Sequence, residues 1–534
     1  MNALADLWIA PDEKLFHIIE SDDLILEQSD DAVWFQLVKS IFEQWQQYLP
    51  IAVKYYQALY QFNQNLATDY QQRKAEQQKN SESKDEARLL FVLDRPTAGN
   101  DDKPKVFESL TPPTTSYSVD EKAIGPGQVP SRLYGRKPKD FFSMYAAFCA
   151  TQVMGIEATA ENVNNYLTGN PSFARACNFT QPTSQKERFT DIPSLRKLEQ
   201  FDQIMTENGI WNEGKNNVIE ENLKNKTIVP EKNLVHDTTH HIAFSGFETV
   251  TYADENGKNK KKSQSHMTKA CSCPDKKNCS HSWELADDGA GTVVKKHNVF
   301  YWAHKASIIG LPDQGIPLVA QAMNDAASHD MTSIVESMEL LKKLFPEVAA
   351  EAVNLLDDSA ADDPKLKASV KEQFDVTLRC HVNPRRSKTL KADQLPKAMT
   401  SLTPRGILRC IEGHEMGYLG SRTSSSSFCY GPPRDELGKI KCNNCPFKSE
   451  CCHTDNSNGR HVNIPFGKLP NISSEDPPMT KRFQQLMKKR PSVERMIYRL
   501  KCILGDRYLS KRGNQNYQAT LDKSMLVLHL LLRQ

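Results

Sequence analysis

The feature that most constrains the fold of this chain is a change of sequence pattern near residue 230. Before it, large apolar residues recur at three- and four-residue spacing, which is typical of helices. This spacing is clearest in WFQLVKSIFEQWQQYLPIAVKYYQALYQF (34–62) and DFFSMYAAFCATQVMGI (140–156). Strand-like segments begin around Lys232, including LVHDTTHHIAF (234–244), FETVTYA (247–253) and VFYWAHKASII (299–309). The pattern therefore predicts helices first and a strand-containing domain after them.

The predicted domain boundaries follow from this change of pattern. Residues 1–75 and 138–230 are predicted to be helical. Residues 76–137 lie between them and contain TPPTTS and GPGQVP, and such Pro, Gly and Ser clusters are typical of linkers and loops. Residues 231–534 form the strand-containing domain. The helical stretch MTSIVESMELLKKLF (331–345) separates its later strands, which indicates an α/β fold.

Length and composition restrict the class of protein. The chain has 534 residues, 39% of them hydrophobic and 25% charged, which is typical of a folded protein with several domains. The longest apolar run, MLVLHLLL at 525–532, is far shorter than the roughly 20 residues that cross a bilayer. The N-terminal MNALADLWIAPDEKLF has early acids and no apolar core, unlike a signal peptide. We therefore expect a cytoplasmic protein without membrane contact.

One acid stands in the most basic part of the chain. The net charge is only +2, but between Lys481 and Arg512 there are eleven Lys and Arg residues against two acids. In a helix that begins at Pro491, Glu494 and Lys501 share one face. Met496, Ile497, Leu500 and Ile503 form the opposite, apolar stripe. An exposed charged face with an ordinary ion pair would also explain this pattern.

Two further acids suggest a chemical role for Glu494. Asp237 lies inside the segment LVHDTTHHIAF, and Asp357 and Asp358 end the apolar run in AVNLLDDSAADD. Two carboxylates on strands and one on a helix would supply oxygen ligands for Mg²⁺ or Mn²⁺, and such ions can act on both sides of a phosphodiester. The surrounding bases would then hold the polyanion. Solvated strand ends or helix caps are the alternatives for each acid alone.

In this order, these segments resemble the DDE transposases of bacterial insertion sequences. LVHDTTHH resembles the strand that carries the first catalytic Asp, here Asp237. LLDDSAADD resembles the second-Asp segment, with Asp358 as the better match and Asp357 one residue away. GIPLVAQAMNDAASHD, which ends in His329 and Asp330, and VTLRCHVNPRR resemble the strands around it.

The C-terminal basic helix carries the last part of the resemblance. Arg490, Glu494 and Lys501 fit the signature Tyr-x2-Arg-x3-Glu-x6-Lys, whereas Met487 occupies the Tyr position. The resemblance runs from about residue 138 to the C-terminus.

The resemblance implies both a fold and a function. It implies an α/β ribonuclease-H-like catalytic core with helical N-terminal domains and small zinc-binding insertions. It implies metal-dependent DNA cleavage and strand transfer by a nucleoid-associated homodimer, with residues 138–230 on the element's terminal inverted repeats. Its catalytic magnesium ligands would be Asp237, Asp358 and Glu494, and its DNA-binding residues would be Arg490, Lys501, Arg495 and Lys489. A domesticated, non-catalytic zinc-containing DNA-binding protein is the alternative, and a nuclease that never joins DNA is a third.

Two cysteine-rich segments form predicted insertions at 255–285 and 425–455. Thirteen cysteines in a cytoplasmic chain favour metal ligation or free thiols over disulfides. Candidate ligands for tetrahedral zinc are Cys271, Cys273, Cys279 and His281 in the first segment, and Cys429, Cys442, Cys445 and Cys451 in the second. Cys452 and His453 are substitutes in the second set. The remaining cysteines, Cys410 among them, are predicted to be buried apolar residues or free thiols. His240 and His241 are predicted to be strand residues that pack or face solvent, with metal ligation as the alternative.

Overall fold

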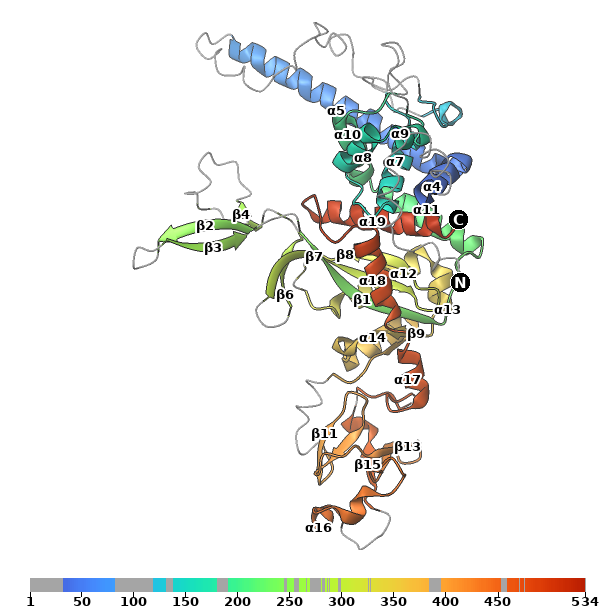
Figure 1. Ribbon diagram of the computed structural model, residues 1–534, viewed down its shortest axis with the longest axis vertical. Helices are drawn as coiled ribbons and strands as arrows, with labels where there is room; N and C mark the ends of the chain where they lie inside the picture. The colour runs from blue at the N-terminus through green and yellow to red at the C-terminus, as the bar shows by residue number, and fades with distance from the viewer. Residues whose placement is uncertain are drawn as a thin grey trace. The chain divides into compact units, whose positions relative to one another are not determined.

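The chain folds into two compact units of helices and mixed sheets (Figure 1). The computed structural model describes residues 32–81, 119–130, 138–179, 191–243 and 247–533, the last range with gaps at 254–258, 266, 269–279, 281–283, 286, 288, 296–298, 325, 327, 384–394, 453–458, 470 and 475. Unit 1 comprises Met1–Glu221, Leu504–Asp506 and Gln518–Gln534. Unit 2 comprises Asn222–Ile503 and Arg507–Tyr517.

Unit 1 is helical wherever it is described in regular structure. Its elements are α4 (Val33–Glu43), η2 (Trp45–Tyr48), α5 (Leu49–Ser81), η3 (Glu121–Ala123), α7 (Phe141–Val153), α8 (Ala160–Gly169), α9 (Pro171–Ala176), α10 (Leu195–Glu207), α11 (Ile210–Lys224) and most of α19 (Asn514–Leu531). Side-chain caps fix several helix starts, as where Asp140 accepts a hydrogen bond from the Ser143 N–H. Helix α5 continues beyond residue 75, so the predicted linker begins later than expected.

Aromatic side chains fill the core of unit 1. Residues Phe141–Gln152 of α7 are all buried, and the Tyr145 ring stacks on Trp211 with ring centroids 5.7 Å apart. In α19 every residue from Ala519 to Leu531 is buried. A helix that is buried on all sides must be surrounded by other elements, and this helix is grouped with the helical unit. The C-terminal segment therefore departs from the predicted domain boundary, which placed it with the strands.

Unit 2 is built on a six-stranded mixed sheet. Its strands are β1 (Asn233–Ile242), β6 (Gly291–Lys295), β7 (Val299–Leu311), β8 (Ile316–Ala322), β9 (Asn354–Leu356) and β10 (Thr377–Arg379). They lie in the order β10-β9-β1-β7-β6, and β8 pairs with β7. Strands β1, β9 and β10 are parallel to their neighbours in that group, whereas β7 is antiparallel to β1, β6 and β8. The predicted change from helices to a mixed α/β arrangement is confirmed.

Helices cover both faces of this sheet. The helices and helical turns of this part of the chain are α12 (Thr332–Leu344), α13 (Pro346–Glu351), η4 (Ser359–Ala361), α14 (Pro364–Phe374), α17 (Lys481–Met487), α18 (Ser492–Tyr498) and the π-helical turn η7 (Arg499–Ile503). Helix α12 contacts β7 and β8, and α18 contacts β1, β7 and β8 (Figure 1). Gly310 of β7 lies so close to α18 that a Cβ there would be 2.5 Å from the Met496 sulfur. The absent side chain of Gly310 therefore lets α18 lie directly on the sheet.

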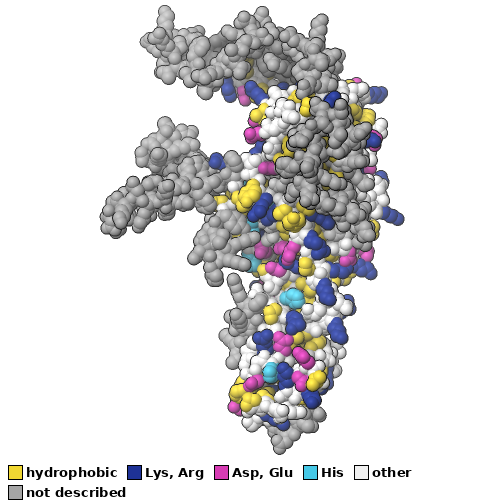
Figure 2. All heavy atoms as spheres, viewed as in Figure 1, with side chains coloured by type: hydrophobic (Ala, Val, Ile, Leu, Met, Phe, Trp, Pro, Cys, Tyr) yellow, Lys and Arg dark blue, Asp and Glu magenta, His cyan; other side chains and the backbone are white. Residues whose placement is uncertain are grey.

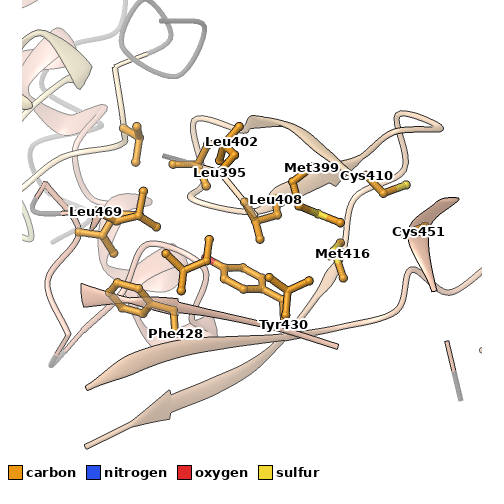
Figure 3. Close-up of a cluster of buried hydrophobic side chains, with 14 residues drawn as sticks. Leu395, Met399, Leu402, Leu408, Cys410, Met416, Phe428, Tyr430, Cys451 and Leu469 are labelled. Atoms are coloured by element: carbon orange, nitrogen blue, oxygen red, sulfur yellow. The ribbon is translucent and has the colours of Figure 1, made fainter. Parts of the chain in front are cut away.

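Two insertions extend from unit 2. Within and beside the first predicted insertion, β2 (Phe247–Ala253) pairs with β3 (Asn259–Ser265), and β4 (Met267–Thr268) pairs with β5 (Glu284–Leu285). The second region contains β11 (Met399–Leu402), β12 (Leu408–Cys410), β13 (Gly417–Arg422), β14 (Ser427–Gly431), η5 (Lys441–Asn444), α16 (Lys448–Cys451), β15 (Val462–Pro465) and η6 (Phe466–Lys468). It has its own hydrophobic core, which includes Leu408, Phe428 and Tyr430 (Figure 3).

Candidate functional site

The register of β1 against β9 places the two strand acids. Val235 pairs with Leu356 in parallel. Continued along both chains, this register sets His236 beside Asp357 and Asp237 beside Asp358. The His236 Nδ1 lies 2.7 Å from the Asp357 Oδ2, in agreement with that register.

Asp237 and Asp358 are thereby directed to the face opposite His236. The His236 Nε2 lies 2.9 Å from the Ser307 hydroxyl and 3.5 Å from the Ser333 hydroxyl of α12, so His236 points to the α12 face. Because successive side chains of a strand alternate between faces, Asp237 points to the face that α18 covers. Of the two candidates for the second acid, Asp358 is the one in register with Asp237, and Asp357 is the buried partner of His236.

Asp237 is partly buried, and each of its two carboxylate oxygens has a hydrogen-bond partner. Its Oδ1 accepts the Thr238 N–H at 2.8 Å, and its Oδ2 lies 2.8 Å from Nη2 of Arg490. Burial raises the pKa of Asp237 to about 6, although the Arg490 guanidinium opposes that rise. A carboxyl group with such a pKa gains and loses its proton near neutral pH.

Arg490 joins the first acid to the third. Glu494 lies in the first turn of α18 with 59% of its side chain exposed, and the Arg490 Nη1 donates a hydrogen bond to its Oε1. The Arg490 Nε is buried, and no hydrogen-bond partner for it exists among the described residues. The structure thus brings Asp237 and Glu494 together through one guanidinium group.

Asp358 caps the short helix η4, and the strand register also places it beside Asp237. Its Oδ1 accepts the Ala360 N–H at 2.6 Å at the start of η4, which is the helix-cap role considered for this residue. Burial raises the pKa of Asp358, the Ala360 N–H lowers it, and the charges of Asp357 and Arg490 act on it in opposite directions. Asp358 is therefore within electrostatic reach of Arg490, although no direct bond joins them.

Asp330 is a further acid near this edge. Its Oδ1 accepts the Thr238 hydroxyl at 2.6 Å and lies 2.5 Å from the Lys305 Nζ. Burial would raise the pKa of Asp330, but these two donors lower it overall. Asp330 is thus held ionised in an existing pair, and it fixes the residue that follows Asp237.

Three of the four predicted DNA-binding residues, Arg490, Lys489 and Lys501, already bond to other groups of the protein. The Lys489 Nζ lies 2.5 Å from the Asp313 Oδ2, and the Lys501 Nζ donates to the His240 carbonyl. Arg495 is exposed on α18. Figure 2 shows Lys and Arg side chains over the described part of the visible face, with Asp and Glu side chains among them.

No ready metal site exists in the part of the chain that the structure describes. There, no three His, Cys, Asp or Glu side chains form a group that could hold an ion as they stand. At the acids, the Arg490 guanidinium occupies oxygens of both Asp237 and Glu494, so an ion would require this side chain to move. The chemistry of the donors nevertheless suits Mg²⁺ or Mn²⁺, which prefer carboxylate oxygens.

In the second cysteine segment, the thiols that act electrostatically on one another differ from the predicted set of four ligands. Burial and the nearby thiols Cys452, Cys442 and Cys410 together raise the pKa of Cys451 to about 11, although the Arg460 charge opposes that rise. Cys410 and Cys451 belong to the same buried core and lie toward one end of it (Figure 3). Cys410, predicted to be a buried apolar residue or a free thiol, is buried in this core and also lies near Cys451.

Cys429 has a different environment from these thiols. It lies between Phe428 and Tyr430 on β14, and both of these neighbours face the core that holds Cys410 and Cys451. By strand alternation Cys429 faces the other side, opposite Asn463 of β15. The first predicted cluster, Cys271, Cys273, Cys279 and His281, lies outside the described residues, as does His453.

His240 and His241 were predicted to be strand residues that pack or face solvent. His241 is buried, and the Tyr517 hydroxyl lies 2.6 Å from its Nδ1. Burial holds the pKa of His241 well below its ordinary value. His241 is therefore a neutral core residue, as predicted, and His240 next to it is half-buried.

Comparisons with protein families and with curated proteins found no match for this chain. In the described residues, no helix is long and apolar enough to cross a membrane.

Proposed function

We propose that this chain is a DNA transposase of the DDE type. It would cleave DNA at the ends of an insertion sequence in a metal-dependent reaction and join the freed ends to target DNA. One observation carries the proposal: Asp237 on β1 and Asp358 just beyond the neighbouring parallel strand β9 lie on one face of the sheet, and the Glu494 helix covers that face. The ends of strands are where α/β proteins place their chemistry.

The mixed sheet supports a ribonuclease-H-like assignment for the core of unit 2. The first acid lies on the central strand β1, and the second follows the adjacent parallel strand β9. Helices lie on both faces, and the last of them supplies the third acid. This is the distribution of acids that the resemblance to DDE transposases implies.

Asp237, Asp358 and Glu494 would hold Mg²⁺ or Mn²⁺ once Arg490 has moved. Bound there, these ions would activate the attacking oxygen and stabilise the leaving oxygen of a phosphodiester. Asp358 would turn one oxygen to the ion while the other stays on the Ala360 N–H. The acids need not form a covalent bond to DNA, because cleavage and joining are both attacks of an oxygen on phosphorus.

The bases around Glu494 would position the DNA backbone. Arg490, Lys489 and Lys501 already contact acceptor oxygens of the protein, and a DNA phosphate offers oxygen acceptors with a full negative charge. Arg495 is exposed beside Glu494 and could bind a phosphate directly. Such contacts set the register on DNA and are independent of base sequence. A homodimer would bring two element ends together.

We also propose structural zinc in the second cysteine segment. Cys442, Cys445 and Cys451 would be three ligands, with Cys410 now a better fourth candidate than Cys429 because it lies in the same core as Cys451 and acts electrostatically on Cys442. A small region with a limited core commonly depends on such a site for stability. Zinc content measured in the purified chain, and in Cys410→Ser and Cys429→Ser variants, tests this assignment. Loss of zinc only in Cys429→Ser would restore the original ligand set.

A strand-transfer assay tests the proposed function against its alternatives. The purified chain is mixed with DNA from both sides of its own reading frame, a supercoiled target plasmid and Mg²⁺ or Mn²⁺. A transposase gives joined products with defined ends, whereas a nuclease gives cuts alone. Bound but uncut DNA would favour a non-catalytic DNA-binding protein, the alternative that the Arg490 ion pairs favour because they already neutralise two of the acids.

A further inference from the structure

Arg490 holds two acids that the proposed metal ion would also need. Its Nη2 lies 2.8 Å from the Asp237 Oδ2, and its Nη1 donates to the Glu494 Oε1. The side chains of Arg490 and Asp237 are 17% and 22% exposed, so solvent screens the bond between them less than that of a surface pair, whereas Glu494 is 59% exposed. The guanidinium thus supplies positive charge where a divalent cation would otherwise supply it.

The same oxygen atoms cannot serve the guanidinium and an ion at once. Mg²⁺ needs carboxylate oxygens at roughly 2.1 Å in nearly octahedral geometry. An ion on the Asp237 Oδ2 would stand beside a positively charged group within hydrogen-bond distance of that oxygen, and the two cations would repel each other. The entry of an ion therefore requires that Arg490 leave.

Arg490 also has an unused donor. Its Nε is buried and lacks a hydrogen-bond partner among the described residues, so two of its three nitrogen atoms carry all of its described side-chain bonds. A buried donor without a partner is unfavourable. A DNA phosphate could satisfy it, because guanidinium groups bind phosphates through two parallel N–H bonds.

We propose that Arg490 is a displaceable counter-ion that makes metal loading depend on DNA. Without DNA, it neutralises Asp237 and Glu494 and keeps their metal affinity low. A DNA phosphate at the site draws the guanidinium away, and the freed carboxylates then bind the ion. This inference rests on the proposed metal site and adds to it a regulation: an enzyme without DNA would stay largely unloaded.

The coupling must act in both directions. If DNA raises the affinity for the metal ion, the metal ion raises the affinity for DNA by the same factor, because both bindings share one thermodynamic cycle. Arg490 would be the residue that links them, since it contacts protein carboxylates in one state and a phosphate in the other. Its replacement should therefore remove the coupling as well as change each affinity.

Manganese titration of the full-length chain without DNA is the primary test, with free Mn²⁺ followed by electron paramagnetic resonance. Arg490→Gln removes the positive charge but keeps a polar side chain of similar length. We expect it to bind Mn²⁺ roughly tenfold more tightly than the unchanged chain. Arg422→Gln removes an exposed arginine charge from β13, outside the proposed site, so it is the matched control and should bind Mn²⁺ nearly as the unchanged chain does.

Additional titrations distinguish failure of this inference from failure of the proposed function. Adding mixed-sequence duplex DNA should tighten Mn²⁺ binding to the unchanged chain and have much less effect on Arg490→Gln. In the double variant Arg490→Gln with Glu494→Gln, the gained affinity should disappear. If the unchanged chain binds Mn²⁺ through these acids but Arg490→Gln binds no more tightly, the counter-ion role is wrong while the metal site stands.

Two further outcomes would also overturn the proposed role of Arg490. If no variant binds Mn²⁺ at these acids, with or without DNA, then both the metal site and the role of Arg490 are wrong. If Arg490→Gln fails to fold, Arg490→Lys is the second variant, since a lysine keeps the charge but cannot bridge two carboxylates with a planar fork. Arg490→Lys should bind Mn²⁺ more tightly than the unchanged chain, and equal or weaker binding would overturn the inference.

Discussion

The His236 Nδ1 lies 2.7 Å from the Asp357 Oδ2, and both side chains are buried directly behind the face that carries the candidate acids. The other Asp357 oxygen accepts the Asp358 N–H at 2.6 Å. The pair therefore fixes the backbone from which Asp358 projects. Its role is to position a neighbour, because neither side chain points to the site itself.

The His236–Asp357 pair predicts a pH dependence of stability. Burial alone would lower the pKa of His236, but the Asp357 carboxylate and its hydrogen bond raise the pKa above its ordinary value. A histidine with a raised pKa in the folded state stabilises the fold below its unfolded pKa of about 6.5, and this contribution is lost as pH rises through the folded pKa. Urea denaturation of the unchanged chain should therefore show unit 2 losing stability above about pH 6.5, whereas Asp357→Asn should lose this slope.

Removing the His236 side chain should lower the stability of the fold more than neutralising Asp357 does. His236→Ala leaves Asp357 buried without its partner, and breaking a buried pair in this way typically costs about 3–5 kcal/mol. Asp357→Asn keeps a hydrogen-bonding group beside a neutral His236 and should cost less. The free energies of unfolding at pH 6 and pH 8 measure both effects, and equal destabilisation by the two variants at both pH values would contradict this role of the pair.

The assignment of the second acid predicts opposite results for two neighbouring residues. Asp358→Asn should lower metal-dependent DNA cleavage by roughly a thousandfold or more, equivalent to about 4 kcal/mol, with little change in stability. Asp357→Asn should lower stability and leave measurable cleavage, because Asp357 faces α12. Cleavage rates and unfolding midpoints of both variants check this prediction. Complete loss of cleavage in Asp357→Asn with full activity in Asp358→Asn would reverse the assignment.

The close approach of α18 to the sheet predicts a sensitive glycine. In Gly310→Ala the new Cβ would lie 2.5 Å from the Met496 sulfur and 2.6 Å from the Ile316 carbonyl oxygen. The sulfur can shift but the backbone oxygen cannot easily do so, and overpacking of this kind typically costs about 1–3 kcal/mol.

We therefore expect Gly310→Ala to lower both stability and the activity that depends on Glu494. Adding Met496→Ala should restore only part of the loss, because the contact with the Ile316 oxygen remains. The unfolding midpoint and the cleavage rate of the single and double variants measure this. A fully stable Gly310→Ala would show that α18 does not pack as described.

A buried acid in unit 1 predicts a stabilising substitution. Asp506 is 0% exposed, and its Oδ1 accepts a hydrogen bond from the Gln152 amide at 2.9 Å. Burial raises the pKa of Asp506 well above its ordinary value, which the bonds to Ser524 and Gln152 only partly oppose. A carboxyl group with a raised pKa favours folding at low pH, and this advantage is lost as pH rises through the folded pKa.

Asp506→Asn removes the cost of a buried charge while it keeps the shape of the side chain. We expect it to raise the stability of unit 1 at pH 8 by about 1 kcal/mol and to have little effect at pH 4. Thermal unfolding at the two pH values tests this difference. Ser510→Ala, a change at another position outside this network, should leave the pH dependence as it was. If Asp506→Asn is less stable than the unchanged chain at pH 8, then the Asp506 carboxylate is charged there and stabilises the fold.

Local spacing predicted the elements of this fold well. The apolar periodicity of residues 34–62 and 140–156 corresponds to α4, α5 and α7, and the strand-like segments around Asp237 and Asp358 correspond to β1 and β9. Helix α18 was predicted from Pro491, with Met496 and Leu500 buried and Glu494 exposed, as observed. These features depend on neighbours in sequence, which one sequence contains.

Long-range contacts were not predictable in the same way. Nothing in RPSVERMIYRLK indicates that Arg490 reaches Asp237, since that contact depends on how α18 crosses the sheet. The partner of His236 needed the β1–β9 register, although the alternation of His236 and Asp237 on one strand could have suggested a role for the histidine. The sequence did not indicate that Cys410 lies near Cys451, because the two are far apart in sequence and only the folded core brings them near one another.

The most direct test of the central claim is cleavage of the DNA that flanks this chain's own reading frame. The purified chain and its Glu494→Gln variant are each incubated with that DNA, with Mg²⁺, with Mn²⁺ and with neither, and the cut positions are mapped. We predict cuts at defined ends that need a divalent ion and that disappear in Glu494→Gln while DNA binding persists. Equal cleavage by both proteins, or DNA binding without any cut under all conditions, would contradict the claim that Asp237, Asp358 and Glu494 form a metal-dependent catalytic site.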